Sequence, residues 1–78
     1  MNELIHIGFV PDGAVIEFPH SAYIYMKVCS ADGMGAVVRL FGGLYLTMSD
    51  LDKRDLGVMC RVLATNLDEY YRKEWSLY

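Results

Sequence analysis

The segment AYIYMKVC, residues 22–29, shows the clearest β-strand pattern in this sequence. Its side chains alternate between an apolar set and a mixed set, as they do when successive strand residues face opposite sides of a sheet. We therefore expect the apolar set to face the core and the mixed set to face outward. The apolar set is Ala22, Ile24, Met26 and Val28, and the mixed set is Tyr23, Tyr25, Lys27 and Cys29.

Segments on both sides of this strand show the same period. Pro11-Asp12-Gly13 predicts a tight turn and hence a hairpin between the first two strands, because proline presets the first turn angle and glycine supplies a positive φ. Gly42-Gly43 predicts either a two-residue hairpin or a bulge inside one bent strand. The chain thus begins as an antiparallel β-meander of four to five strands. Besides 22–29, the expected strands are residues 3–10, 14–18, 36–41 and 44–47.

The pattern changes near residue 50. Ser49 and Asp52 have the spacing of a capping-box variant, and the only glycine from there to about residue 75 is Gly57. At about 100° per residue, the apolar side chains of this segment fall on one face. We therefore predict one long C-terminal helix, about residues 50–75, packed on one face of the sheet. The expected fold is a single α+β domain over residues 1–78.

The two periods together predict a core. It combines one face of each strand with one stripe of the helix. Its expected members are Ile5, Ile7, Phe9, Ile16, Phe18, Ile24, Met26, Val28, Val38, Leu40, Leu56, Met59, Cys60, Leu63 and Leu67.

Composition suggests that part of the apolar surface is covered by another chain. Of the 78 residues, 54% are hydrophobic, whereas soluble domains contain about 45–50%. A domain of this size buries only about 60% of the surface that its unfolded chain exposes. We therefore expect a homodimer or a complex with another protein.

Charge and targeting signals narrow the function classes. The net charge is −3 and no basic stripe is present, which disfavours direct nucleic-acid binding. The N-terminal segment has no basic, then apolar, secretory pattern, and no apolar run approaches the roughly 20 residues of a membrane span. Two cysteines suit a reducing compartment. We expect a cytoplasmic protein.

No catalytic or metal motif stands out. The candidate soft ligands, His6, His20, Cys29 and Cys60, lack the paired spacing of zinc sites. A Cys29–His20 nucleophile pair has no support in the spacing. We expect no metal, no cofactor, no structural disulfide and no enzymatic activity.

Two sets of residues are candidates for contact surfaces. Aromatic residues interleaved with Lys and Arg on the outer sheet face are typical of protein interfaces. An apolar stripe opposite the core face of the predicted helix favours self-association. The predicted partner-binding residues are Tyr23, Tyr25, Lys27, Arg39, Phe41 and Tyr45. The predicted self-association residues are Leu51, Val58, Val62 and Trp75.

The sequence therefore favours a small cytosolic protein-binding module that regulates or inhibits a larger partner. One alternative is a virus-encoded inhibitor of a host nucleic-acid enzyme, because an acidic protein can occupy a basic site. A less favoured alternative is a small ligand-binding protein or enzyme. A concave pocket that encloses Cys29 or a histidine would favour this last reading, whereas a flat apolar patch would favour protein binding.

Overall fold

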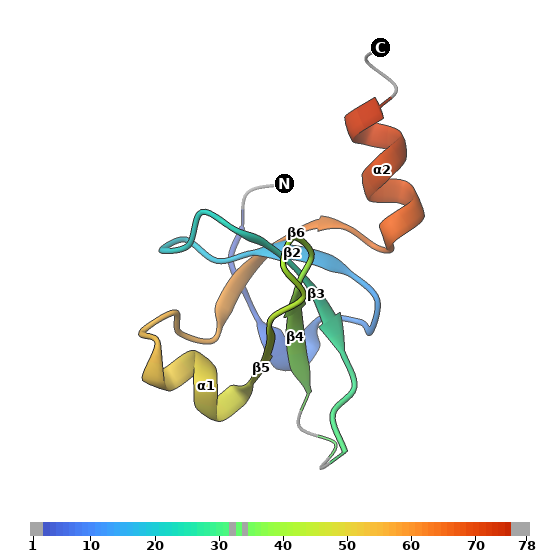
Figure 1. The fold of residues 1–78 in the computed structure, drawn as a ribbon. Coiled ribbons are helices and arrows are strands. Elements are labelled where there is room, and N and C mark those ends of the chain that lie inside the picture. Colours follow the sequence, from blue (N-terminus) through green and yellow to red (C-terminus); the bar gives the residue numbers. More distant parts are fainter. Residues whose placement is uncertain (1–2, 32, 34, 76–78) are drawn as a thin grey trace.

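The fold is an antiparallel sheet with short helices (Figure 1). A computed structural model describes residues 3–31, 33 and 35–75, the side chains of residues 73–75 excepted. Within this part, six strands form one sheet in the order β1-β6-β2-β3-β4-β5. The α+β class is confirmed, but the number of strands exceeds the expected four to five. The strands are β1 (Ile5–His6), β2 (Val15–Glu17), β3 (Ile24–Val28), β4 (Ala36–Arg39), β5 (Tyr45–Thr47) and β6 (Met59–Ala64).

Three short helical segments accompany the sheet. A 3-10 helix, η1, spans Ile7–Phe9, and the α-helices are α1 (Met48–Lys53) and α2 (Leu67–Trp75). Figure 1 shows that α1 follows directly on β5, whereas α2 projects away from the sheet. None of the helices in the described part of the chain has the length and apolarity needed to cross a membrane.

The prediction of one long helix over residues 50–75 is wrong. After α1, Asp55 and Gly57 take positive φ angles of 61° and 77°, and such left-handed angles end a helix. The chain then returns as β6, which lies between β1 and β2. Asn66 starts α2, because its side-chain oxygen accepts a hydrogen bond from the Glu69 backbone N–H at 2.7 Å.

Helix α1 begins earlier than the predicted Ser49–Asp52 signal. Thr47 is its N-cap, and its hydroxyl accepts a hydrogen bond from the Asp50 N–H at 3.3 Å. In return, the Asp50 carboxylate accepts a hydrogen bond from the Thr47 N–H at 3.0 Å. The backbone bond from Thr47, followed by the bond from its side chain, holds the pKa of Asp50 below its ordinary value.

The N-terminal strand is much shorter than the predicted 3–10. It covers only Ile5–His6 and pairs with β6, so no hairpin joins it to β2. The turn at Pro11-Asp12-Gly13 does form, since the Ala14 N–H donates to the Pro11 carbonyl at 3.2 Å. Gly42 and Gly43 lie in a hairpin connection between β4 and β5, not in a bulge, but this connection spans residues 40–44 and is longer than the predicted two-residue turn.

The face of β3 that packs on the core is the reverse of the predicted one. Tyr25 lies opposite Ile16 of β2 and opposite Arg39 of β4, and directly opposed residues share one face of a sheet. Tyr25 and Lys27 are only 3% and 6% exposed. Their polar tips are satisfied at the ends of the strand, so that both long side chains can be buried. In β4, likewise, Val37 rather than Val38 is fully buried.

The core lies on this shared face. Ile7, Ile16, Phe18 and Cys60 are confirmed as core residues, whereas the predicted core residue Phe9 is 83% exposed. Met59 is also exposed. Within the core, the rings of Phe18 and Tyr25 meet edge to face, with centroids 5.2 Å apart. The buried cluster comprises Ile7, Val10, Ala14, Ile16, Phe18, Tyr25, Val37, Leu46, Leu51 and Cys60.

Candidate protein-binding surface

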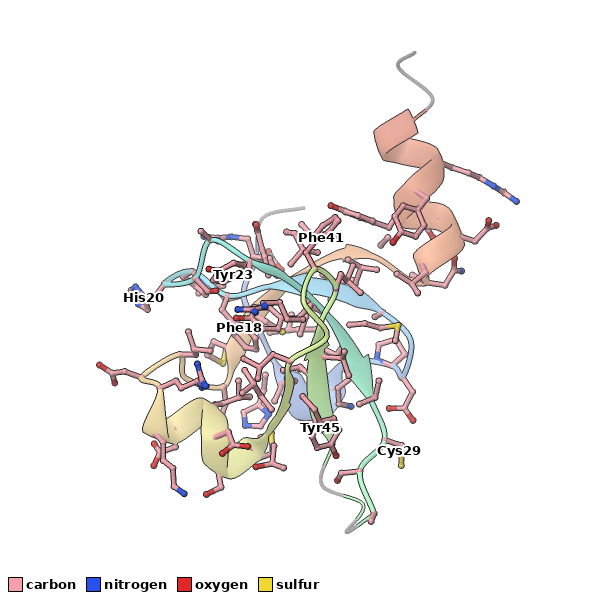
Figure 2. The ribbon with its side chains drawn as sticks, viewed as in Figure 1. Phe18, His20, Tyr23, Cys29, Phe41 and Tyr45 are labelled. Carbon is pink, nitrogen blue, oxygen red and sulfur yellow. The ribbon has the colours of Figure 1, made fainter. Side chains whose placement is uncertain are left out.

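Two exposed aromatic residues contact one arginine, which stacks on the ring of Tyr23 and bonds to the backbone of Phe41. Tyr23 precedes β3 and is 52% exposed, and Phe41 lies in the β4–β5 turn and is 68% exposed. The guanidinium carbon of Arg39 lies 4.5 Å from the centre of the Tyr23 ring, a cation–π contact. The Arg39 Nε donates a hydrogen bond to the Phe41 carbonyl at 2.9 Å. We call Tyr23, Arg39 and Phe41 the aromatic surface (Figure 2).

The other predicted partner-binding residues lie elsewhere. Tyr45 is exposed, but it is opposite Val38 and so faces the other side of the sheet from Arg39. Figure 2 shows Tyr23 and Phe41 at the upper edge of the sheet and Tyr45 in its lower part. The predicted exposure of Tyr25 and Lys27 is wrong, since both are buried. Three of the six residues are therefore brought together.

The Lys27 side chain bonds within the protein and is not exposed for contact with a partner. Its ammonium donates to the Val10 carbonyl at 3.1 Å and to the Asp12 carboxylate at 3.4 Å. Its stem lies so close to Gly35 that a Cβ added there would be 2.7 Å from the Lys27 Cε. Lys27 thus ties the turn before β2 to the centre of β3.

A polar pocket with a volume of about 250 Å³ opens beside the aromatic surface. It collects residues from the loop before β3, the end of β4 and the segment after α1. In its wall, the Tyr25 hydroxyl lies 3.1 Å from the Ser21 hydroxyl, so that one donates to the other. We call it the Arg39–Arg54 pocket. It is lined by His20, Ser21, Ala22, Tyr23, Tyr25, Arg39, Leu44, Arg54 and Leu56.

Sequence reasoning placed only Tyr23, Tyr25 and Arg39 of the pocket residues in a common contact surface. Arg54, the C-cap of α1, lies inside the predicted long helix, and His20 is predicted only as a candidate metal ligand without a partner. Nothing local in the sequence places either residue beside Arg39, because their approach depends on how α1 and the loop before β3 pack around the β4–β5 turn.

The predicted self-association stripe is not a continuous surface. Leu51 is fully buried in the core, and Val58 and Val62 pack partly against it. The stripe was defined on a helix, but Val62 belongs to β6 and lies opposite Ile16. The side chain of Trp75 lies outside the described residues. The expectation that Val62 faces away from the core is therefore wrong.

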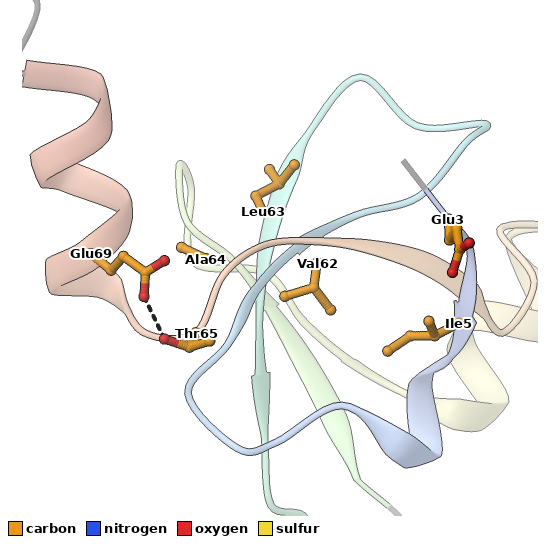
Figure 3. Close-up of a pocket in the computed structure, with 7 residues that line it drawn as sticks. All are labelled: Glu3, Ile5, Val62, Leu63, Ala64, Thr65 and Glu69. Carbon is orange, nitrogen blue, oxygen red and sulfur yellow. Dashed lines mark hydrogen bonds between the residues drawn. The ribbon is translucent and has the colours of Figure 1, made fainter. Parts of the chain in front are cut away.

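A second recess, with a volume of about 350 Å³, lies between β1, β6 and the start of α2 (Figure 3). Its carboxylates do not form a catalytic pair, because Figure 3 shows Glu3 and Glu69 at opposite sides of it. The Thr65 hydroxyl donates to Glu69. The recess is lined by Glu3, Ile5, Val62, Leu63, Ala64, Thr65 and Glu69.

Cys29 and His20 do not come together. Cys29 is exposed and Cys60 is buried, and both are free. Burial raises the pKa of Cys60, and the positive charge of Lys27 offsets only part of this rise. Figure 2 shows His20 and Cys29 on opposite sides of the molecule, so the Cys29–His20 pair is not formed. Across residues 3–31, 33 and 35–75, no three His, Cys, Asp or Glu side chains are grouped as metal ligands.

No protein-family model, curated protein or solved structure matches this chain. Its function must therefore be inferred from its own residues, and the aromatic surface with the adjoining pocket is the candidate site.

Proposed function

We propose that this protein is a small protein-binding module whose contact surface is the aromatic surface. One observation carries the proposal: Tyr23 and Phe41 are 52% and 68% exposed, and Arg39 stacks on the Tyr23 ring and bonds to the Phe41 carbonyl. Tyrosine, phenylalanine and arginine are enriched in protein interfaces, and tyrosine and arginine are frequent among the residues that dominate their affinity.

The local structure supports a pre-formed surface. Gly42 and Gly43 take φ angles of 102° and 66°, which lets the chain turn tightly behind Phe41. The Arg39 N–H donates to the Leu44 carbonyl at 2.8 Å, and the Gly43 N–H donates to the Arg39 carbonyl at 3.1 Å. A turn held in this way loses little conformational entropy when a partner binds.

Such a module would regulate or inhibit a larger partner in the cytoplasm, since its means of action is contact. A virus-encoded inhibitor of a host nucleic-acid enzyme is the alternative form of the same proposal. The net charge of −3 and the exposed carboxylates of Asp52, Asp55 and Asp68 would suit a basic site on that enzyme. The identity of the captured partner separates the two forms.

Affinity capture from the native host, with two matched variants, tests the proposal. Phe41→Ser removes the most exposed ring of the aromatic surface. Phe9→Ser removes the exposed ring of η1, which contacts His6 and not the aromatic surface. We expect wild type and Phe9→Ser to retain the same protein, and Phe41→Ser to lose at least about tenfold of it, as truncation of a central aromatic does.

Two outcomes contradict the proposal. If all three proteins retain the same amount of partner, the aromatic surface does not bind it. If Phe9→Ser loses the partner and Phe41→Ser keeps it, the contact surface lies at η1 instead.

Self-association stays a prediction, and α2 is the element that would carry it. This helix projects from the sheet, and its Tyr71 is exposed. Light scattering of the wild type and of Tyr71→Asp measures the oligomeric state. A wild type that remains a monomer at high concentration would contradict self-association.

A further inference from the structure

The Arg39–Arg54 pocket brings positive charge together in an acidic protein. Arg39 and Arg54 are 15 positions apart in sequence, as their numbers give, yet line one cavity with His20. None of the described residues that line it is acidic. Neither arginine takes part in the ion pairs of the described residues, which join Lys27 to Asp12, Arg61 to Glu17 and Arg72 to Asp68.

Arg39 is oriented for a ligand by its neighbours. Stacking on Tyr23 fixes the plane of the guanidinium, and the bond from Nε to the Phe41 carbonyl fixes its rotation. Gly42 allows this placement, because a Cβ there would lie 2.7 Å from the Arg39 Nη2. The terminal nitrogens of Arg39 make no hydrogen bond to a described residue, so they remain available as a two-pronged donor.

The rest of the pocket supplies hydroxyl donors and an apolar wall. Tyr25 is nine-tenths buried or more, and its hydroxyl shares one hydrogen bond with Ser21. One hydroxyl of this pair therefore keeps a proton to donate to a ligand oxygen. Leu44 and Leu56 pack against the core beneath and complete the lining.

Arg54 adds a second guanidinium to the lining of the cavity. Its backbone N–H donates to the Asp50 carbonyl at the end of α1, which fixes where the side chain starts. Its positive charge also contributes to lowering the pKa of Asp50, although less than the bonds from Thr47 do. The guanidinium forms no ion pair within 4 Å in the described part of the chain.

We propose that the Arg39–Arg54 pocket binds a carboxylate side chain of the protein partner, next to an apolar side chain that covers Phe41 and Tyr23. This inference rests on the proposed protein-binding function and adds the chemistry of the partner segment. A planar carboxylate fits the paired donors of arginine, and the aromatic surface adjoins the pocket through Tyr23 and Arg39.

The probe is a capped Phe-Glu dipeptide, titrated into isotope-labelled protein at constant ionic strength and followed by NMR. Its control is the capped Phe-Gln dipeptide, which replaces the carboxylate by an amide of the same shape. We expect Phe-Glu to shift the signals of residues 20–25, 39–44 and 54–56 with a Kd of millimolar order, as befits a small ligand. We expect Phe-Gln to bind at least about fivefold more weakly, because charge-assisted bonds are the stronger ones.

Arg54→Gln is the test variant, and Lys53→Gln is its matched control. Both remove one positive charge from the end of α1, but Lys53 does not line the pocket. We expect Arg54→Gln to weaken Phe-Glu binding about fivefold or more and Lys53→Gln to weaken it less than about twofold, as a screened surface charge would. Equal losses would overturn the site in favour of general electrostatics.

Other ligands decide between anion classes. Inorganic phosphate and a short oligothymidylate are titrated under the same conditions. Oligothymidylate that shifts the same signals with a lower Kd than Phe-Glu would overturn the assignment to a protein carboxylate. Phosphate that binds more weakly than Phe-Glu is the expected result, since it gains nothing from Phe41 and Tyr23.

The inference and the proposed function fail differently. If Phe41→Ser loses the captured partner while Arg54→Gln retains it and Phe-Glu does not bind, the pocket proposal is wrong and the module proposal survives. If Phe-Glu binds in an Arg54-dependent way but no partner depends on Phe41, the anion site is real and the proposed protein-binding function is wrong.

Discussion

Lys27 and Arg39 lie on the same face of neighbouring strands, yet their surroundings differ. Lys27 is 6% exposed and bonded to Val10 and Asp12, and we call its surroundings the closed end of the core. Arg39 is half-buried, stacks on Tyr23 and has no carboxylate partner among the described residues, and we call its surroundings the open end. Lys27 therefore stabilises the fold, whereas Arg39 is available to a ligand.

The largest expected contrast is in thiol reactivity. Cys60 is buried in the core, where burial raises its pKa and Lys27 only partly compensates, whereas Cys29 is exposed. An aromatic disulfide reagent should modify Cys29 quickly. It should modify Cys60 on the order of a thousandfold more slowly, because the thiolate is scarce and the site must open first.

Single variants assign the two reactions. Cys29→Ser should abolish the fast phase and leave the slow one. Comparable rates for both thiols in the folded protein would show that the reagent reaches Cys60 readily and that its surroundings are not closed to solvent.

The two cations should differ next in their effect on stability. Lys27→Ala removes a buried stem and leaves the Val10 carbonyl without its ammonium donor, which should lower the free energy of unfolding by about 2–4 kcal/mol. Arg39→Ala should lower it by less than about 1 kcal/mol, because its contacts are partly solvated. Denaturant titration of both variants measures the difference. Similar losses of stability would contradict the claim that Lys27 stabilises the fold more than Arg39 does.

The same two residues show what the sequence could and could not predict. Alternation gave the correct inner face for Ile16 and Phe18, since each is apolar and its neighbour Glu17 is not. In β3 it failed, because Tyr25 and Lys27 carry long apolar bodies whose polar tips reach Ser21 and Val10. The alternation within the strand does not show whether Tyr25 and Lys27 or Ile24 and Met26 are buried. The groups that bond to the polar tips of Tyr25 and Lys27 lie outside the strand.

The C-terminal segment failed for a different reason. Residues 58–64 alternate weakly and also fit a helical stripe, so the period alone does not separate strand from helix. The segment forms a strand because it pairs with both β1 and β2, and this pairing depends on the arrangement of the whole sheet. The candidate site could likewise be predicted only in part. Tyr23, Arg39 and Phe41 could be named from the sequence, whereas the positions of Arg54 and His20 depend on tertiary packing.

Two glycines offer a matched test of the closed and open ends. A Cβ at Gly35 would lie 2.7 Å from the Lys27 Cε, and a Cβ at Gly42 would lie 2.7 Å from the Arg39 Nη2. Both positions have positive φ, so either Ala variant carries a strain of about 1–2 kcal/mol. Gly35→Ala should destabilise the protein by about 1 kcal/mol more, since buried Lys27 has no room to move and Arg39 does.

Thermal or denaturant unfolding of the two variants gives this difference directly. The Gly42→Ala variant has a second readout, because it displaces the Arg39 guanidinium and should weaken Phe-Glu binding. Equal destabilisation by both variants would mean that Lys27 is as free to move as Arg39.

The smallest expected effect concerns Asp50, whose carboxylate completes the capping box of α1 near Arg54. Bonds from Thr47 lower its pKa in the folded protein. Because the folded-state pKa is below that of the unfolded chain, the ionised carboxylate stabilises the fold above the ordinary aspartate range. This contribution is lost as the pH falls through the lowered pKa. Asp50→Asn should thus be less stable than wild type at neutral pH, and the difference in the free energy of unfolding should vanish on acidification.

Urea titrations of both proteins at a series of pH values measure this gap in stability. Asp52→Asn is the control, since Asp52 lies in the same helix and is exposed. A gap that stays constant down to strongly acidic pH would show that the Asp50 charge does not stabilise the start of α1.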